Sequence, residues 1–451
     1  MITWNDIHQI GPIGTQHLPE DARITGADID SRRIKSGMLF IARQGDQADG
    51  HQFIEQAFMN GAVAAIVESR WYDSAENSDG LPLIVVEDSD SALRGLAAQV
   101  RSNFSGPVLG ITGSNGKTTT KEMTAEILGA QYTVLSTPGN FNNLWGLPLT
   151  ILQAQQEHDF WVLEMGTNHP GEIEALCDIA SPTAGLITTV NESHSEHFHS
   201  LEAIAKEKLM LFESIPEGGI IFQNLDNEFI AKYSSPGKTV ITYSVETKAQ
   251  KTAQITSIDP YSRVHCQING IGKVRLGVPG VFQISNALAA VTIADTYGVP
   301  GEVIQDRLES FHGVPGRVKI VEKQNYTVID DTYNANPASM REAIDILAKM
   351  PAGSRRIAIL GDMLELNSTR ERKHRDIGEY LGEHRIDIVI GVGELARNII
   401  KGVQTTSTAE TYHFDDYVEC MNSIRGIVHT GDIILVKASH GIHLEKVVGA
   451  L

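Results

Sequence analysis

Short apolar runs rich in Val and Ile alternate with helix-length amphipathic segments through most of the chain. This alternation predicts repeated strand–helix units, which pack as mainly parallel sheets with helices on their faces. The clearest predicted strands are Met38–Ala42, Ala62–Val67, Leu83–Val86, Val108–Ile111, Trp161–Met165, Leu186–Val190, Thr327–Asp330, Ile357–Leu360, Ile386–Ile390 and Ile433–Val436. Helical patterns lie at Gln52–Asn60, Ser91–Phe104 and Lys117–Leu128. The sequence therefore predicts an α/β fold.

The chain length sets the expected number of domains. At about 150 residues per domain, 451 residues predict roughly three domains, each able to bury its own core. A turn-prone junction at Val314-Pro315-Gly316 marks the predicted start of the last domain. We predict an N-terminal domain over residues 1–85, a central domain over 86–313 and a C-terminal domain over 314–451.

Charge and cysteine usage exclude several classes of protein. The 37 basic and 56 acidic residues leave a net charge of −19, which argues against a nucleic-acid groove or a polybasic membrane surface. The apolar runs fall short of the ~20 residues of a membrane span, and the N-terminus lacks the pattern of a signal peptide. Cys177, Cys266 and Cys420 lack the spacing of disulfide or zinc sites. We expect a soluble, cytoplasmic protein without nucleic acid or membrane insertion.

A glycine-rich segment, Gly110–Thr119, separates an apolar run from a predicted helix. In a phosphate-binding loop, glycines let successive backbone N–H groups turn toward one anion, and the following helix N-terminus stabilises its charge. Lys117 can reach the terminal phosphates, and Thr118 can offer its hydroxyl to Mg²⁺. The usual spacing has glycine where Ile111 stands, so the match is to a variant. The segment predicts an ATP site; a glycine turn with a solvated lysine is the alternative.

Two further segments carry groups that can bind magnesium. Glu164 closes an apolar run, where a carboxylate can face the phosphates and hold Mg²⁺ through oxygen. His194 belongs to a cluster of histidine and acidic residues after another predicted strand. One histidine of this cluster could bind metal while the others lie on a solvated loop. The two segments alone do not choose between a metal site and ordinary surface side chains.

Five motifs stand in the order found in the Mur ligase family, which the chain resembles over nearly its whole length. They are Thr112–Thr118, Gly139–Asn143, Glu164–Ile173, Gly313–Arg317 and Asp330–Pro337. The chain most resembles the member that handles D-alanyl-D-alanine. This resemblance implies an ATP-dependent ligase of peptidoglycan synthesis that joins D-alanyl-D-alanine to UDP-N-acetylmuramoyl-tripeptide through an acyl phosphate. It also implies an N-terminal UDP-substrate domain, a central P-loop ATPase-like domain and a C-terminal Rossmann-like domain.

The resemblance implies roles for the matching positions. Nucleotide binding is implied for Gly113, Ser114, Asn115, Gly116, Lys117, Thr118, Thr119, Asn286, Arg317, Asp331 and Tyr333. Binding of the UDP-tripeptide and the dipeptide is implied for Ser31, Arg32, Gly45, Asn140, Asn142, Asn143, Asn168, His169, Asn334 and Asn336. Two Mg²⁺ ions are implied at Thr118, Glu164, His194 and a carbamylated Lys208. Catalytic roles are implied for Lys117, His194, Lys208 and Arg317.

Some positions keep a competing interpretation. Carbamylation would turn the Lys208 ammonium into an anionic oxygen ligand, and Lys206 is the rival lysine in the same segment. Asn286 could simply cap a helix. The chain also departs from the family pattern, with Phe282-Gln283 where His-Asn is common and His440 where arginine is common.

Three other functions remain open from sequence. The chain could be a Mur ligase that adds a different amino acid. It could be a P-loop hydrolase or kinase, which would release or transfer phosphate without an amine acceptor. It could also be a nucleotide-binding protein that has lost catalysis, an interpretation supported by His440 and Phe282. The residues that oppose it are Lys117, Glu164, His194 and Lys208. We further predict a monomer.

Overall fold

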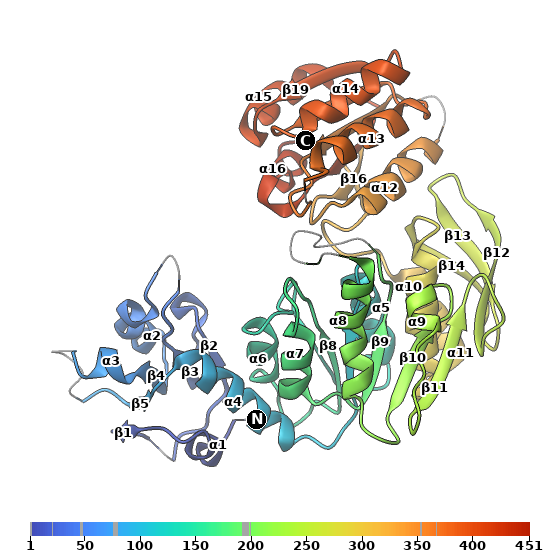
Figure 1. Ribbon diagram of the computed structural model, residues 1–451. Helices are drawn as coiled ribbons and strands as arrows, with labels where there is room; N and C mark the ends of the chain where they lie inside the picture. Colours follow the sequence, from blue (N-terminus) through green and yellow to red (C-terminus); the bar gives the residue numbers. More distant parts are fainter. Residues whose placement is uncertain are drawn as a thin grey trace.

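The computed structural model describes residues 2–19, 21–45, 48–74, 80–191, 198, 200–351, 354–366 and 368–451. Within these ranges the strands form three sheets, of five, nine and six strands. The sheets follow one another along the chain, each with its own helices (Figure 1). The predicted α/β class with three domains is confirmed. The boundaries predicted near residues 85 and 313 remain predictions.

The first sheet has the order β1-β5-β4-β3-β2, with β1 antiparallel to β5 and β2 to β5 paired in parallel. Its strands are β1 Gly14–Gln16, β2 Gly26–Asp28, β3 Met38–Ile41, β4 Ala64–Glu68 and β5 Leu83–Val86. The helices are α1 Trp4–Gln9, η1 Ser31–Arg33, η2 Gly50–Phe53, α2 Ile54–Met59 and α3 Ser69–Tyr72. Strands β3, β4 and β5 are buried throughout, because a parallel sheet is covered on both faces.

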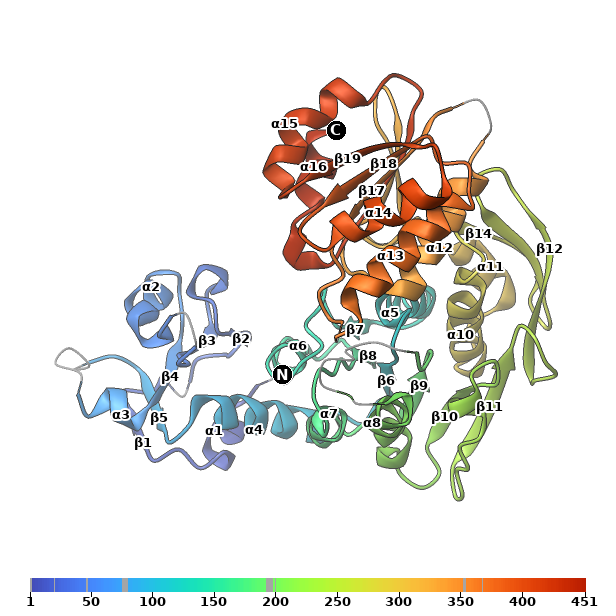
Figure 2. The same cartoon turned by 45° about the horizontal axis from the view of Figure 1, so that its top comes forward.

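Helix α4 (Ser89–Ser102) connects the first domain to the second. Asp88 begins it by accepting a hydrogen bond from the Ser91 backbone N–H, the usual role of an N-cap aspartate. Near its end, the buried Arg101 donates to the backbone oxygens of Ala180 and Ser181 at 2.6 and 2.7 Å. Figure 2 shows α4 running from the first sheet to α7 (Glu172–Ala180). These bonds fix the end of α4 against the end of α7.

The second sheet has the order β14-β13-β12-β11-β10-β9-β6-β8-β7. Its strands are β6 Val108–Thr112, β7 Val134–Ser136, β8 Phe160–Glu164, β9 Ala184–Ile187, β10 Ile220–Asn224, β11 Thr239–Ser244, β12 Lys251–Ile258, β13 Arg263–Ile268 and β14 Gly272–Pro279. The other helices are α5 Lys117–Leu128, α6 Gly146–Ile151, α8 Leu201–Ser214, α9 Glu228–Ala231, α10 Gln283–Thr296 and α11 Gly301–Ser310. The predicted strands do not include β10 to β14. In β13, in β14 and in the first half of β12, buried residues alternate with half-buried or exposed ones, as expected for antiparallel strands with one solvated face.

The third sheet has the order β15-β16-β20-β17-β18-β19, with β15 antiparallel to β16 and the others paired in parallel. Its strands are β15 Lys319–Glu322, β16 Thr327–Asp331, β17 Arg356–Gly361, β18 Ile388–Val392, β19 Glu410–Phe414 and β20 Ile433–Lys437. The helices are α12 Pro337–Lys349, α13 Arg370–Gly382, α14 Ala396–Thr406, α15 Tyr417–Ile427, η3 His440–Ile442 and α16 Glu445–Ala450. In parallel sheets, ligands bind beyond the carboxyl ends of the strands. Here β16, β20 and β17 end at the same level.

The helices and the cysteines bear on the expected cellular environment of the protein. Over the described ranges, no helix is both long and apolar enough to cross a membrane. Cys177, Cys266 and Cys420 are buried free thiols. Burial raises the pKa of the Cys177 thiol to about 12, so this thiol stays protonated and unreactive at neutral pH.

Candidate active site

A cavity of about 750 Å³ lies where the second and third domains face each other. Residues predicted from five separate motifs meet in its lining, together with Asn286. The predicted residues that line it are Ser114, Asn115, Gly116, Lys117, Thr119, Asn140, Asn142, Asn143, Glu164, Asn168, His169, Asn286, Arg317, Asp331, Tyr333, Asn334 and Asn336. The fold therefore brings the motifs to one place, as a shared active site requires.

Three of the other predicted residues lie apart from this cavity. Ser31, Arg32 and Gly45 belong to the first domain and are outside this cavity. The exposed Arg32 guanidinium pairs with Asp30 at 2.7 Å. His194 lies outside the described residues. The uridine contacts and the histidine metal ligand therefore remain predictions.

The phosphate loop joins β6 to α5, and two of its glycines have positive φ angles. Gly116 has φ of +81° directly before the helix begins at Lys117. Gly113 has φ of +148°, and a Cβ there would lie 1.9 Å from Thr188 Oγ1. The Lys117 ammonium donates to the Gly113 backbone oxygen at 2.6 Å, and burial lowers its pKa. An anion in the loop would meet this ammonium together with the first N–H groups of α5.

Replacing Gly116 with alanine is expected to weaken ADP binding about tenfold, because a non-glycine residue at positive φ costs about 1–2 kcal/mol. The added Cβ would also lie 2.4 Å from the Asn286 Oδ1 atom. Calorimetric titration with ADP measures the effect. Gly95→Ala, inside helix α4 where a Cβ meets only Ile10 at 3.5 Å, is the matched control with unchanged affinity. Equal ADP affinity of Gly116→Ala and wild type would contradict this role of the loop.

Glu164 and Thr118 each have a buried side-chain oxygen that could bind magnesium. Glu164 ends β8 and has no exposed surface, and its Oε1 atom accepts a hydrogen bond from Asn142 at 2.7 Å. Glu164 Oε2 and Thr118 Oγ1 are buried and lack a hydrogen-bond partner among the described residues. Buried oxygens without partners are unfavourable, and Mg²⁺ binds through oxygen. These two oxygens therefore fit the ion that the sequence implies.

The described residues hold no cluster of three or more His, Cys, Asp or Glu side chains that could bind a metal by themselves. This is compatible with magnesium, which commonly binds through one or two protein carboxylates together with substrate phosphates and water. Magnesium binding here would therefore depend on the nucleotide.

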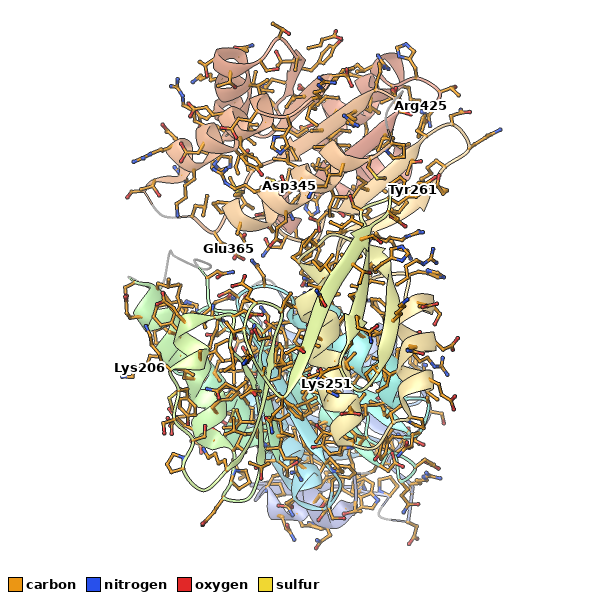
Figure 3. The ribbon with its side chains drawn as sticks, turned by 90° about the vertical axis from the view of Figure 1, so that its right-hand side faces the viewer. Lys206, Lys251, Tyr261, Asp345, Glu365 and Arg425 are labelled. Carbon is orange, nitrogen blue, oxygen red and sulfur yellow. The ribbon has the colours of Figure 1, made fainter. Side chains whose placement is uncertain are left out.

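Helix α8 separates the two rival lysines of its segment. Lys208 is 1% exposed, whereas Lys206 lies on the outer surface (Figure 3). Burial, together with the nearby Lys117 ammonium, lowers the pKa of Lys208 to about 7. The neighbouring Glu207 is already engaged by the backbone N–H groups of Gly171 and Ile173 at 2.7 and 2.9 Å. Lys208 is therefore the lysine whose amine is neutral in part at physiological pH.

The third domain contributes a stacked group of side chains. The Arg317 guanidinium lies 3.9 Å from the centre of the Tyr333 ring. The His440 ring lies 5.8 Å from the same ring, at 24° to its plane. His440, which departs from the family pattern, is thus part of the aromatic wall beside Arg317. The quadrupole of an aromatic ring attracts a cation that lies over its face. This attraction favours a fixed position for the Arg317 guanidinium over Tyr333.

Asp331 is largely occupied by contacts within the protein. Its Oδ2 atom accepts from the buried Lys437 ammonium at 2.6 Å, and its Oδ1 atom accepts from the Val318 N–H at 3.2 Å. Lys437 also donates to the Asn334 backbone oxygen at 2.8 Å. Asp331, at the end of β16, therefore connects the segment just before β15 to β20, in addition to any contact with a ribose.

Two asparagines connect the nucleotide-facing parts of the site. Asn286 lies inside α10, which begins at Gln283, so the alternative that it caps a helix is wrong. Its amide donates to Gln283 and accepts from Thr120. Asn336 caps α12 and also donates to the Asn115 side chain at 2.9 Å. This last bond joins the third domain directly to the phosphate loop.

Sequence reasoning missed several residues of the cavity lining. Glu365 follows the predicted strand Ile357–Leu360, and its place at a strand end was the available signal. Figure 3 shows it on the side of the third domain that faces the second domain. Glu342 lies within α12, where burial raises the pKa of its carboxyl to about 7. Trp145 lies under the Arg43 guanidinium at 4.5 Å. Neither Glu342 nor Trp145 carried a signal in the sequence.

Profiles of three protein domains match the chain in order. They are "Mur ligase family, catalytic domain" over residues 23–101, "Mur ligase middle domain" over 111–294 and "Mur ligase, glutamate ligase domain" over 316–440. The chain belongs to the Mur ligase family. The three matches follow the order of the three sheets, and the roles implied for the separate domains remain predictions.

Individual relatives resemble this Mur ligase over nearly their whole length. The UDP-N-acetylmuramoyl-tripeptide–D-alanyl-D-alanine ligase of Bacillus subtilis is 33% identical, over 95% of this chain and 93% of the relative. The enzyme of the same name from Escherichia coli is 34% identical, over 96% of both chains. The structure of MurF from Acinetobacter baumannii has a TM-score of 0.84 at 29% identity, covering 99% and 98% of the two chains. MurF ligase from Thermotoga maritima in complex with ADP has a TM-score of 0.79 at 30% identity, covering 95% and 97%.

Proposed function

We propose that this Mur ligase joins D-alanyl-D-alanine to UDP-N-acetylmuramoyl-tripeptide, with ATP as the energy source and an acyl phosphate as the intermediate. The product is the UDP-muramoyl-pentapeptide precursor of peptidoglycan. The observation that carries the proposal is the convergence of Lys117, Glu164 and Arg317 on one cavity. The relatives of this name, similar over nearly their whole length, support the choice of D-alanyl-D-alanine as the amine.

The reaction proceeds in two steps. A carboxylate oxygen of the tripeptide attacks the γ-phosphorus of ATP, and the bond between that phosphorus and the oxygen of ADP breaks. The dipeptide amine then attacks the acyl carbon, phosphate leaves with the electron pair of the broken C–O bond, and the amine loses a proton. Such phosphoryl transfer depends mostly on positioning and charge stabilisation rather than on covalent work by side chains.

The residues of the cavity supply the needed positive charge. Lys117, beside the phosphate loop, would contact the terminal phosphates, and Arg317 would reach them from the third domain. Magnesium, held at Glu164 and Thr118 and at a second position by carbamylated Lys208, would offset the remaining negative charge between the carboxylate and ATP. Catalysis is therefore assigned mainly to electrostatic stabilisation.

The two-domain cavity would also protect the intermediate. An acyl phosphate is open to hydrolysis, so water must be kept from it until the amine arrives. The bond between Asn336 and Asn115 brings the third domain against the phosphate loop. We infer that this contact helps to hold the third domain over the bound nucleotide.

We propose that the enzyme acts as a monomer in the cytoplasm, on two small-molecule substrates and without a nucleic-acid partner. The buried free thiols and the net charge of −19 support this setting.

The test is phosphate release from ATP with the UDP-muramoyl-tripeptide, with and without D-alanyl-D-alanine, while mass spectrometry follows the muramoyl product. Release that requires the dipeptide, with a product heavier by one dipeptide residue, is the expected result. Release at the same rate without the dipeptide would indicate a hydrolase. A tripeptide ending in diaminopimelate and one ending in lysine should both be supplied, because the cavity lining leaves this choice open.

A further inference from the structure

Asn142 is joined to the end of β8 by its side chain. Its amide N–H donates to Glu164 Oε1 at 2.7 Å. The second oxygen of the same carboxylate, Oε2, is buried without a hydrogen-bond partner in the part of the chain that the structure describes. The two oxygens of Glu164 are therefore not equivalent, since one is occupied by the amide and the other has free acceptor capacity.

The backbone around this contact keeps the amide in place. The Gly166 N–H donates to the Asn142 backbone oxygen at 2.8 Å, and the Glu164 N–H donates to Thr137 Oγ1 at 2.9 Å. A Cβ on Gly166 would lie 2.8 Å from both Cγ and Oδ1 of Asn142. The close approach of the amide to β8 thus depends on a glycine at position 166.

We propose that Asn142 is a positioning residue that makes Glu164 a one-oxygen ligand for magnesium. This inference rests on the proposed function, in which Glu164 holds Mg²⁺. The amide occupies Oε1 and fixes the plane of the carboxylate, so that only Oε2 is available to the ion. Hydrogen bonds that orient a metal-binding side chain raise metal affinity, and their loss typically weakens it about 10–100-fold.

The same contact bears on the choice of metal. Mg²⁺ requires near-octahedral geometry at short distance, whereas Ca²⁺ accepts carboxylates through one or both oxygens. With Oε1 occupied by Asn142, two-oxygen binding by Glu164 is disfavoured. Loss of the amide should therefore weaken Mg²⁺ binding more than Ca²⁺ binding.

The sequence had suggested a different role, in which Asn142 contacts the substrate directly. That role predicts a raised KM for the UDP-tripeptide and no change in metal affinity. The positioning role predicts a change in metal affinity even when the tripeptide is absent. The two can be separated in an enzyme that does not turn over.

The experiment titrates Mn²⁺ into the full-length enzyme with ADP present and with the tripeptide and the dipeptide absent. Electron paramagnetic resonance measures the free Mn²⁺. Mg²⁺ or Ca²⁺ is then added, and the Mn²⁺ that it displaces gives the affinity of the enzyme for each of these ions. Asn142→Ala and Gly166→Ala are expected to weaken Mg²⁺ binding at least about tenfold, with a smaller effect on Ca²⁺. Gly166→Ala keeps Asn142 but displaces its amide, so this variant tests whether the position of the amide matters, whereas Asn142→Ala tests whether its presence matters. Asn269→Ala, in an exposed turn outside the cavity where its amide donates to the Gln250 backbone oxygen at 2.9 Å, is the control with unchanged metal affinity.

Glu164→Gln separates failure of this inference from failure of the proposed function. If Glu164→Gln loses metal while Asn142→Ala and Gly166→Ala bind Mg²⁺ as the wild type does, the positioning role is overturned and the metal role of Glu164 stands. If Glu164→Gln binds metal as the wild type does, the metal role of Glu164 is wrong and the positioning role falls with it. An unchanged thermal unfolding profile of each variant shows that the protein remains folded.

Discussion

Lys208→Ala is expected to lower ligase activity by at least about a hundredfold, because it would remove a direct magnesium ligand, and loss of mere supporting contacts already costs 10–100-fold. The side chain is 1% exposed, and its pKa is lowered to about 7 by burial and by the Lys117 ammonium. Carbamylation needs a neutral amine, whose nitrogen attacks CO₂ with release of one proton. Lys208 meets this requirement at neutral pH, as an ordinary exposed lysine does not.

The assay measures dipeptide-dependent phosphate release by Lys208→Ala, and the matched control is Lys206→Ala, whose exposed side chain should leave activity unchanged. A small carboxylate such as formate should partly restore the Lys208→Ala enzyme by supplying the missing oxygen ligand. An unchanged thermal unfolding profile would exclude misfolding. Full activity of Lys208→Ala would remove the assignment of the second magnesium.

The lowered pKa of Lys208 also predicts how carbamylation should depend on pH. Because the group's pKa is lowered, its neutral form grows as pH rises through about 7. Activation of the wild-type enzyme by added bicarbonate should therefore be weak below that pH and stronger above it, and absent in Lys208→Ala at every pH. Activation that falls with rising pH would contradict a carbamate at this lysine.

Lys437→Met is expected to lower the free energy of unfolding of the third domain by about 3–5 kcal/mol, the usual penalty for leaving one partner of a buried ion pair uncompensated. The Lys437 side chain is 2% exposed and that of Asp331 is 9% exposed, with 2.6 Å between Nζ and Oδ2. The substitution also removes the bond to the Asn334 backbone oxygen. The carboxylate of Asp331 would then remain buried without its cation.

Urea unfolding, followed by hydrogen exchange of third-domain amides, measures this loss. The double variant Lys437→Met with Asp331→Asn should recover part of the lost stability, since it removes the uncompensated charge. Lys446→Met, at an exposed position beside Tyr417, is the control and should change stability by less than about 0.5 kcal/mol. A loss of stability in Lys437→Met no larger than in this control would show that the pair does not stabilise the domain.

Much of the fold could be predicted because its signals are local. Short Val- and Ile-rich runs, each followed by an amphipathic helical pattern, predict the βα units of the parallel sheets. The phosphate loop requires only a strand, glycines and a helix in order, and Lys117 begins the helix as predicted. The antiparallel strands β12 to β14 are not predicted from the sequence, because exposed polar residues separate their apolar residues.

The sequence by itself determined the class, the family resemblance and about half of the residues that line the cavity, since these depend on residue types within short segments. Only the tertiary structure decided which groups meet. Asn142 reaches Glu164 across 22 residues, Lys437 reaches Asp331 across 106, and Asn336 reaches Asn115 across 221. Burial of Lys208 and exposure of Lys206 likewise depend on how α8 packs against the sheet. Contacts between distant segments are set by how whole layers pack, which no local pattern encodes.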